Sequence, residues 1–119
     1  MMTGRKMITQ ALSLLGFAEN DGNLQLTQRV MNRALPLVNL VYTDLRTVCG
    51  MDYKTLESLT DEIQLPERAL DIFACGLAGY IAQSEGDDNS QYFWSSEYQT
   101  RRVKLSQVTE YKDTLPTVE

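Results

Sequence analysis

Apolar residues recur along this chain at steps of three and four, the spacing of helices with one buried face. The first of these helices is short, begins near Thr3 or Gly4 and stops at Gly16, where a glycine suits a helix end. The second runs from about Leu24 to Val48, carries a broad apolar surface and ends before Gly50. With two further helices described below, the pattern predicts an all-α fold with a single domain of about four helices.

Two residues of the long second helix need an explanation. Pro36 lies in its middle, where it removes one backbone hydrogen bond and clashes with the preceding turn, so we expect a kinked but continuous helix rather than a break. Asn39 lies beside the apolar surface, and a buried amide without partners costs about 1–3 kcal/mol. We therefore expect Asn39 to bond the backbone of a loop. Residues 51–64 lack a period and form an ordered connection.

The third helix is entered at Leu65-Pro66, since proline at the first helical position loses no needed donor. One face is large and apolar, and a neighbouring face is built from small residues. Interior glycines cost about 1 kcal/mol each against alanine, which close approach of another backbone can offset. That backbone belongs either to the same chain or to a neighbouring subunit, and both alternatives stay open. The small residues are Cys75, Gly76, Gly79 and Ala82.

An acidic turn at 85–90 separates the third helix from a fourth, with Asp88 or Asn89 as its N-cap. This last helix reaches about Val108. Its apolar stripe is interrupted by arginines at 101 and 102, so its far half is expected to leave the core. We divide the chain into a helical domain, 1–108, and an irregular C-terminal docking tail, 109–119, where Leu115-Pro116 prevents a simple helical continuation. The stripe consists of Trp94, Tyr98, Leu105 and Val108.

Charge is distributed unevenly over the 119 residues, whose formal net charge is −5. Residues 1–50 carry a net +2 and residues 51–119 a net −7. Nucleic-acid binding depends on basic residues that displace counterions from phosphates, and the one basic cluster is Arg101, Arg102 and Lys104. A solvated or ion-paired face explains this trio better than a phosphate site. A helix-turn-helix factor would need a recognition helix, and only 27–33 approaches one.

The residue inventory offers little for catalysis. There is no histidine, no cysteine pair at zinc spacing and no phosphate-binding glycine loop. Cys49 and Cys75 are expected to be buried thiols rather than a disulfide, and the acidic turns lack the alternation of a calcium loop. We therefore expect no enzyme activity, no catalytic residue, no cofactor and no metal. Without an apolar signal core or an 18-residue apolar run, the protein is expected to be soluble and cytosolic when made.

The order of several short motifs resembles the head-tail connector (adaptor) proteins of tailed bacteriophages over nearly the whole chain. The resemblance implies a mostly helical subunit that forms a ring, of twelve copies on the portal, beneath the portal vertex of a filled capsid. There it would extend the DNA channel without sequence-specific DNA binding and present a surface to the next tail-completion protein. It would assemble in the host cytoplasm and end in the virion. The motifs are Ala11-Leu12 to Leu15-Gly16, Asn39, Leu65-Pro66, Gly76-Leu77-Ala78, Glu85-Gly86-Asp87, the aromatic pair before Tyr98, and Asp113-x-Leu115-Pro116.

Three groups of residues are candidates for the partner interfaces of such a subunit. The small-residue face of the third helix is one, the basic trio of the fourth is another, and the tail is the third, with Asp113, Leu115 and Pro116. Another class of function fits the same helices. A small cytosolic helical adaptor or regulator would hold a partner helix in a groove between its own helices, and it would be a stable monomer.

Overall fold

The computed structural model describes the backbone of residues 1–16 and 24–114, and the side chains of residues 1–16 and 28–108. This part of the chain holds four helices and no strand, so the all-α expectation is confirmed. Its one β-bridge joins Thr3 to Glu62. None of the described helices combines the length and the hydropathy that a membrane span requires. The helices are α1 (Gly4–Leu14), α2 (Leu24–Val48), α3 (Glu67–Ser84) and α4 (Asp88–Thr114).

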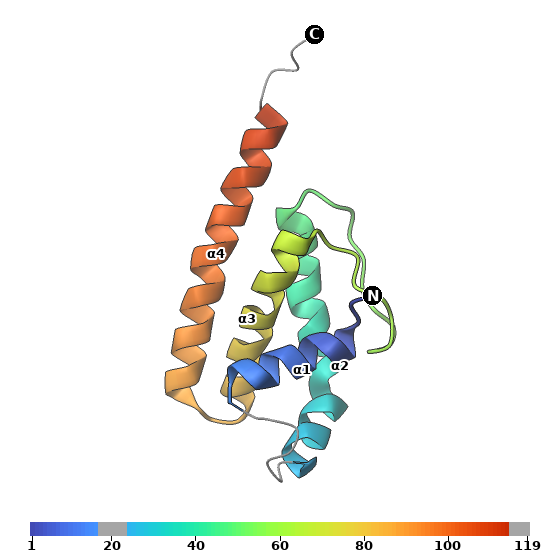
Figure 1. Cartoon of the computed structure of the whole chain (residues 1–119), viewed down its shortest axis with the longest axis vertical. Coiled ribbons are helices and arrows are strands. Elements are labelled where there is room, and N and C mark those ends of the chain that lie inside the picture. Colours follow the sequence, from blue (N-terminus) through green and yellow to red (C-terminus); the bar gives the residue numbers. More distant parts are fainter. Residues whose placement is uncertain (17–23, 115–119) are drawn as a thin grey trace.

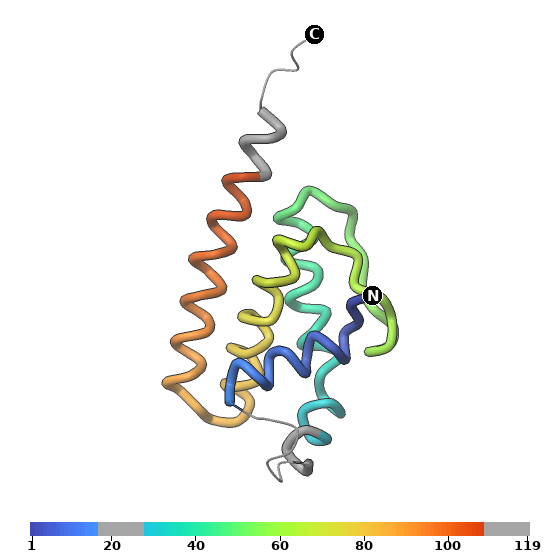
Figure 2. The backbone as a smooth tube through the Cα atoms, viewed as in Figure 1, coloured from blue at the N-terminus to red at the C-terminus, as the bar shows by residue number. Residues whose placement is uncertain are grey.

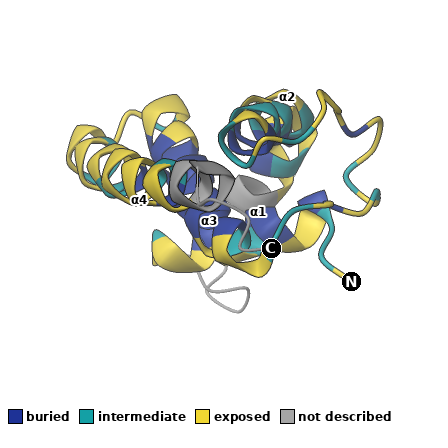
Figure 3. Ribbon diagram, turned by 90° about the horizontal axis from the view of Figure 1, so that it is seen from above, coloured by how far each residue is buried: buried dark blue, intermediate teal, exposed yellow. Residues whose placement is uncertain are grey.

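Helix α3 forms the centre of the molecule, and the other three helices pack around it (Figure 1). Every residue from Ile72 to Gly79 is buried, although an ordinary surface helix buries only one face. Helix α4 runs antiparallel beside α3 on one flank, whereas α1 and α2 pack on the other sides of α3 (Figure 3). Helix α4 extends past the ends of the other helices (Figure 1), and Figure 2 traces the path of the chain through the bundle as a tube.

Caps set the helix boundaries close to where the sequence predicts them. Thr3 Oγ1 accepts a hydrogen bond from the backbone nitrogen of Lys6 at 3.3 Å, and α1 is followed by Gly16 with a φ of 86°. Helix α3 begins one residue later than predicted, with Pro66 as its N-cap. The N-cap prediction for α4 is wrong by one residue. Asp87 takes that role, accepting from the Ser90 nitrogen at 3.1 Å, and hydrogen bonding to Ser90 lowers the Asp87 pKa.

Helix α2 runs unbroken through Pro36, as the favoured alternative required, while a kink at that point stays a prediction. The prediction for Asn39 is confirmed. Its side-chain nitrogen donates to the carbonyl oxygen of Leu56 at 3.0 Å, and its side-chain oxygen accepts from the Leu56 nitrogen at 2.8 Å. The amide therefore makes with Leu56 the two hydrogen bonds that a neighbouring backbone strand would make. These bonds hold the 51–64 connection against α2.

Arg46 fixes the two ends of the 51–64 connection, a role that the sequence did not predict. This side chain is buried near the end of α2, where its Nε donates to the carbonyl oxygen of Asp52 at 2.6 Å and its Nη1 to that of Gln64 at 3.0 Å. The guanidinium also lies 5.6 Å from the centre of the Tyr42 ring. Arg46 thus satisfies loop carbonyls that would otherwise lose hydration on burial. One arginine among the apolar neighbours of a helix end is the only sequence signal for it.

The predicted end of the fourth helix, near Val108, is too early. Helix α4 continues to Thr114, so the first six residues of the tail predicted as irregular are helical. Extending an existing helix needs no new nucleus, which is why a polar stretch without an apolar stripe can continue one. Leu115 and Pro116 lie outside the described residues, and so does the side chain of Asp113. Burial along α4 ends later than expected, since Leu105 beyond the arginines is still buried while Val108 is exposed.

Candidate functional site

The small-residue face of α3 packs against α4 of the same chain. A Cβ added to Gly76 would lie 2.9 Å from the ring of Tyr98 and 3.1 Å from Val41, and one added to Gly79 would lie 2.9 Å from Ser95 Oγ. Real Cβ atoms essentially never come as close as 2.9 Å to another heavy atom, and 3.1 Å is tighter than most such contacts. Glycine is therefore what lets α4 approach so closely. Of the two alternatives left open by the sequence, the structure has the seam within the chain.

Within the chain this face is thus occupied by α4, and its assignment to a partner interface stays a prediction. Cys75, Gly76, Gly79 and Ala82 are all buried in the chain, and α4 packs over the two glycines. The Cys75 thiol donates to the carbonyl oxygen of Asp71 at 3.8 Å, and burial raises its pKa, which keeps it protonated at neutral pH. Cys49 is also a free thiol, as expected, but it is only half-buried. Neither cysteine has the lowered pKa of a reactive one.

Arg102 forms a polar cluster with Asp44 and Tyr98 that ties α4 to α2. Its Nε and Nη2 donate to the two carboxylate oxygens of Asp44 at 2.7 and 2.8 Å, and the Tyr98 hydroxyl donates to the same carboxylate at 2.5 Å. Burial alone would raise the Asp44 pKa, but the hydrogen bonds from Arg102 and Tyr98 and the arginine charge outweigh it and lower that pKa. Burial, with the bond to Asp44, raises the Tyr98 pKa. Arg102 is thus used inside the chain.

The two other basic residues of the trio stay at the surface. Arg101 Nε lies 3.3 Å from Glu97 Oε2, one turn back on α4, and both side chains are exposed. Lys104 is exposed and has no ion pair with any residue whose side chain the structure describes. Of the trio predicted to make charge contacts across an interface, Arg101 and Lys104 remain available for that role.

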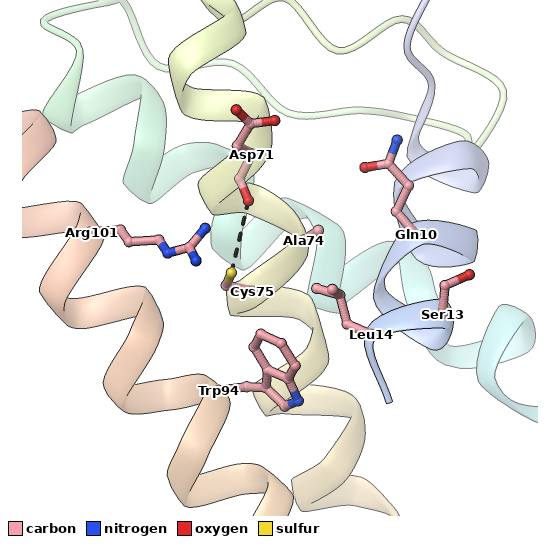
Figure 4. A pocket seen from close by; sticks show the side chains of 8 residues that line it. All are labelled: Gln10, Ser13, Leu14, Asp71, Ala74, Cys75, Trp94 and Arg101. Atoms are coloured by element: carbon pink, nitrogen blue, oxygen red, sulfur yellow. Dashed lines mark hydrogen bonds between the residues drawn. The ribbon is translucent and has the colours of Figure 1, made fainter. Parts of the chain in front are cut away.

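A groove of about 460 Å³ lies between α1 and α4, with α3 as its floor (Figure 4). Trp94 and Arg101 reach into it from α4, and Leu14 from α1, while small side chains of α3 leave the space between them. Its walls are mixed, with apolar surface in the middle and polar groups along the rim, as in sites that bind peptides or small ligands. The full lining is Gln10, Ser13, Leu14, Asp71, Ala74, Cys75, Trp94 and Arg101.

A second hollow, of about 280 Å³, lies on the opposite flank of α4, where α2, α3 and α4 meet. The Asp44–Arg102 pair forms its polar wall, and the exposed side chains of Leu40 and Tyr80 form its apolar rim. Helix α4 therefore has a depression on each flank, with different chemistry on the two sides. Sequence reasoning found neither, because each combines residues from three helices.

The described part of the chain holds no group of three or more cysteine or acidic side chains arranged to bind a metal ion. Glu85, in the acidic turn, instead pairs with Arg29 at 2.5 Å and Arg33 at 3.2 Å, which joins the end of α3 to the first half of α2. These arginines belong to the 27–33 segment that a DNA-reading helix would use. Their pairing with Glu85 counts against that alternative.

No family model matches this sequence, and neither the curated proteins nor the solved structures contain a significant match to it.

Proposed function

We propose that this chain is a head-tail connector (adaptor) subunit of a tailed bacteriophage, which binds the portal vertex as a ring and offers a docking surface to tail-completion proteins. The order of short motifs described above supports the proposal, and so does the all-α architecture. Its partners in this proposal are the portal protein, the next tail protein and copies of itself. The protein would then be a structural component of the virion, assembled in the host cytoplasm.

One structural observation carries the proposal: α4 has a depression on each flank, the two are lined by different residues, and the helix extends past the other helices. A ring of identical subunits needs two different, complementary surfaces on each copy, because every contact joins unlike faces. The two flanks of α4 supply such a pair. The far end of α4 supplies a third surface, directed away from the bundle and available to a partner above or below the ring.

Charge supports the same role. With a net charge of −5, a ring of these subunits around a DNA channel would repel phosphates rather than bind them. Arg29, Arg33 and Arg102, which a DNA-binding surface would need free, have carboxylate partners within the chain. DNA would therefore pass such a ring without being held.

The proposal is tested with capsids from the genome that encodes the chain, in which the reading frame should lie beside portal and capsid genes. Purified protein is mixed with DNA-filled capsids and sedimented through a glycerol gradient. We expect it to travel with capsids that carry the portal, to appear as a ring at one vertex in electron micrographs, and to leave portal-free capsids bare. Equal binding to both kinds of capsid, or to neither, would rule the connector role out.

The groove between α1 and α4 favours a second candidate function, a helical adaptor that holds a partner's helix. The groove offers the exposed edge of Leu14 and the Trp94 ring, which suit the apolar stripe of an amphipathic helix. This alternative predicts a protein that stays monomeric at every concentration and ignores portal-bearing capsids. Sedimentation alone cannot separate the two functions, because a connector ring can require the portal as its template, so the capsid experiment decides.

A further inference from the structure

The groove between α1 and α4 combines three features that together describe a ligand. Its middle is apolar, where Leu14, Ala74 and Trp94 meet. Gln10 and Ser13 line the α1 side with groups that can donate and accept hydrogen bonds. Arg101 supplies a positive charge on the α4 side. An extended peptide with two apolar side chains and one carboxylate satisfies all three features.

We propose that this groove binds residues 115–119, Leu-Pro-Thr-Val-Glu, of a second copy of the chain. Leu115 and Val118 would cover the apolar middle, the peptide backbone would bond to the α1 side, and Glu119 would pair with Arg101. The inference deepens the proposed function, because it names the contact that joins neighbouring subunits.

Charge in the groove sets the direction of the peptide. Asp71 lines the α3 side and would repel a carboxylate there, whereas Arg101 lies across from it. The present partner of Arg101 is Glu97, in an exposed pair that contributes little to stability, so Arg101 can exchange it for Glu119 at small cost. Lys104, one helical turn further along α4, adds a second positive charge on the same side.

The length of the segment shows why it must come from another copy. Helix α4 places Thr114 about 20 Å beyond Arg101 and about 30 Å beyond Trp94, at 1.5 Å per residue. Fully extended, five residues span at most about 17 Å. Folded back along its own helix, Val118 would stop well short of Trp94, so within one chain the apolar side chains cannot reach the apolar middle of the groove.

A contact of this kind joins unlike surfaces, since one copy gives the segment and the next gives the groove. Repeated, such contacts close into a ring when the rotation between copies permits, and otherwise continue as an open filament. The contact also spares the closed seam between α3 and α4, which stays intact in every copy.

Trp94 makes the proposal measurable, because it is the only tryptophan of the chain and it lines the groove. A synthetic peptide of residues 113–119, amidated at its end and free of aromatic residues, is titrated into the full-length protein below the concentration at which it self-associates. We expect a saturable blue shift of the Trp94 emission as the peptide excludes water from the ring. A linear or absent response would overturn the proposal.

Charge reversal separates specific pairing from general stickiness. Arg101→Glu should weaken binding of the peptide at least tenfold, while Arg5→Glu, an exposed arginine on α1 that does not line the groove, should leave binding unchanged. A peptide carrying Glu119→Arg should recover affinity for the Arg101→Glu protein. Equal loss in both protein variants, or no recovery, would contradict the assigned pairing. Circular dichroism establishes that both variants keep their helices.

Sedimentation velocity tests whether the segment joins two copies. The wild-type mass should rise with protein concentration, and a Leu115→Ser, Val118→Ser variant should stay at monomer mass over the same range. If the variant associated as the wild type does, the inference would be wrong. It would also be wrong if the Trp94 spectra of wild type and variant differed by the same amount at every protein concentration, because that result indicates a contact within one chain. None of these measurements involves a portal, so they can succeed where the capsid experiment fails, and the reverse.

Discussion

The two sides of α4 show opposite solutions to the same packing problem. Toward α3 and α2 the helix is held by a close seam, in which Tyr98 fills the space that Gly76 leaves and its hydroxyl bonds to Asp44. Toward α1 the helix stands away, and Trp94 and Arg101 border an open groove. The missing side chain of Gly76 therefore allows the close contact with Tyr98. On the α1 side, large and partly exposed residues border a surface that a partner can use.

The largest effect is expected from filling the seam. In Gly76→Leu the new side chain must displace an aromatic ring and Val41, neither of which can move without disturbing the core. We expect a loss of about 3 kcal/mol or more in the free energy of unfolding, at or beyond the upper end of usual overpacking costs. Urea denaturation followed by circular dichroism measures it.

The matched control for this change is Gln83→Leu, which adds the same side chain to an exposed position of the same helix. Its free energy of unfolding should stay within about 0.5 kcal/mol of the wild type. If Gly76→Leu proved equally harmless while it blocked self-association, the seam would have to open, and the small-residue face would return as a subunit contact.

The polar cluster that closes the seam should give the next largest effect. Tyr98→Phe removes a hydrogen bond to a charged acceptor at a buried position, which should lower the free energy of unfolding by about 1.5–3 kcal/mol by usual magnitudes.

Asp44→Asn should also destabilise the fold, and the size of this effect should depend on pH. Because the Asp44 pKa is lowered on folding, its contribution is present above the ordinary pKa near 4 and disappears as the pH falls through the lowered value.

Urea denaturation of the wild type and Asp44→Asn at a series of pH values measures this contribution. The stability difference should be constant from pH 5 to pH 7 and shrink below about pH 4. Growth of the difference in acid would mean that Asp44 is stabilised in its protonated form, which would contradict the bidentate pairing with Arg102.

Much of this architecture follows from the sequence, and the exceptions have physical causes. Periodicity locates four helices because each buries an apolar face, and Asn39 was expected to find a loop backbone because a buried amide needs partners. The glycines of α3 predict that another backbone approaches closely, but they do not identify it, since spacing within one helix says nothing about which other helix approaches. The helical continuation to Thr114 was missed because a polar sequence carries no apolar stripe.

The candidate site depends more on which helices pack against each other than on the sequence of any one helix. Arg101 and Arg102 are neighbours with the same chemistry, and nothing local distinguishes them. Asp44, 58 residues before Arg102, decides that one is used inside the chain and the other faces the groove. The groove itself draws on three helices, so no single segment could reveal it.

At the groove between α1 and α4, shortening an apolar side chain should lower the free energy of unfolding only slightly but weaken self-association strongly. Leu14 is 40% exposed, so Leu14→Ser should lower the free energy of unfolding by no more than about 1 kcal/mol. The same variant should lose the concentration-dependent rise in mass seen for the wild type by sedimentation velocity. A loss of several kcal/mol would instead place Leu14 in the core and make the groove a part of the folded interior.

The smallest stability effect is expected from Arg101→Gln, and it sharpens the comparison between the two flanks. Its pairing with Glu97 is exposed and lies within one helix, where such pairs contribute about 0.3–0.5 kcal/mol and weaken in salt. Arg102→Gln, one position away, leaves Asp44 without its bidentate donor and should cost clearly more. Denaturation of both variants at low and high salt makes the test. Equal costs would mean that α4 is held alike on both flanks, and the distinction between a closed seam and an open groove would fail.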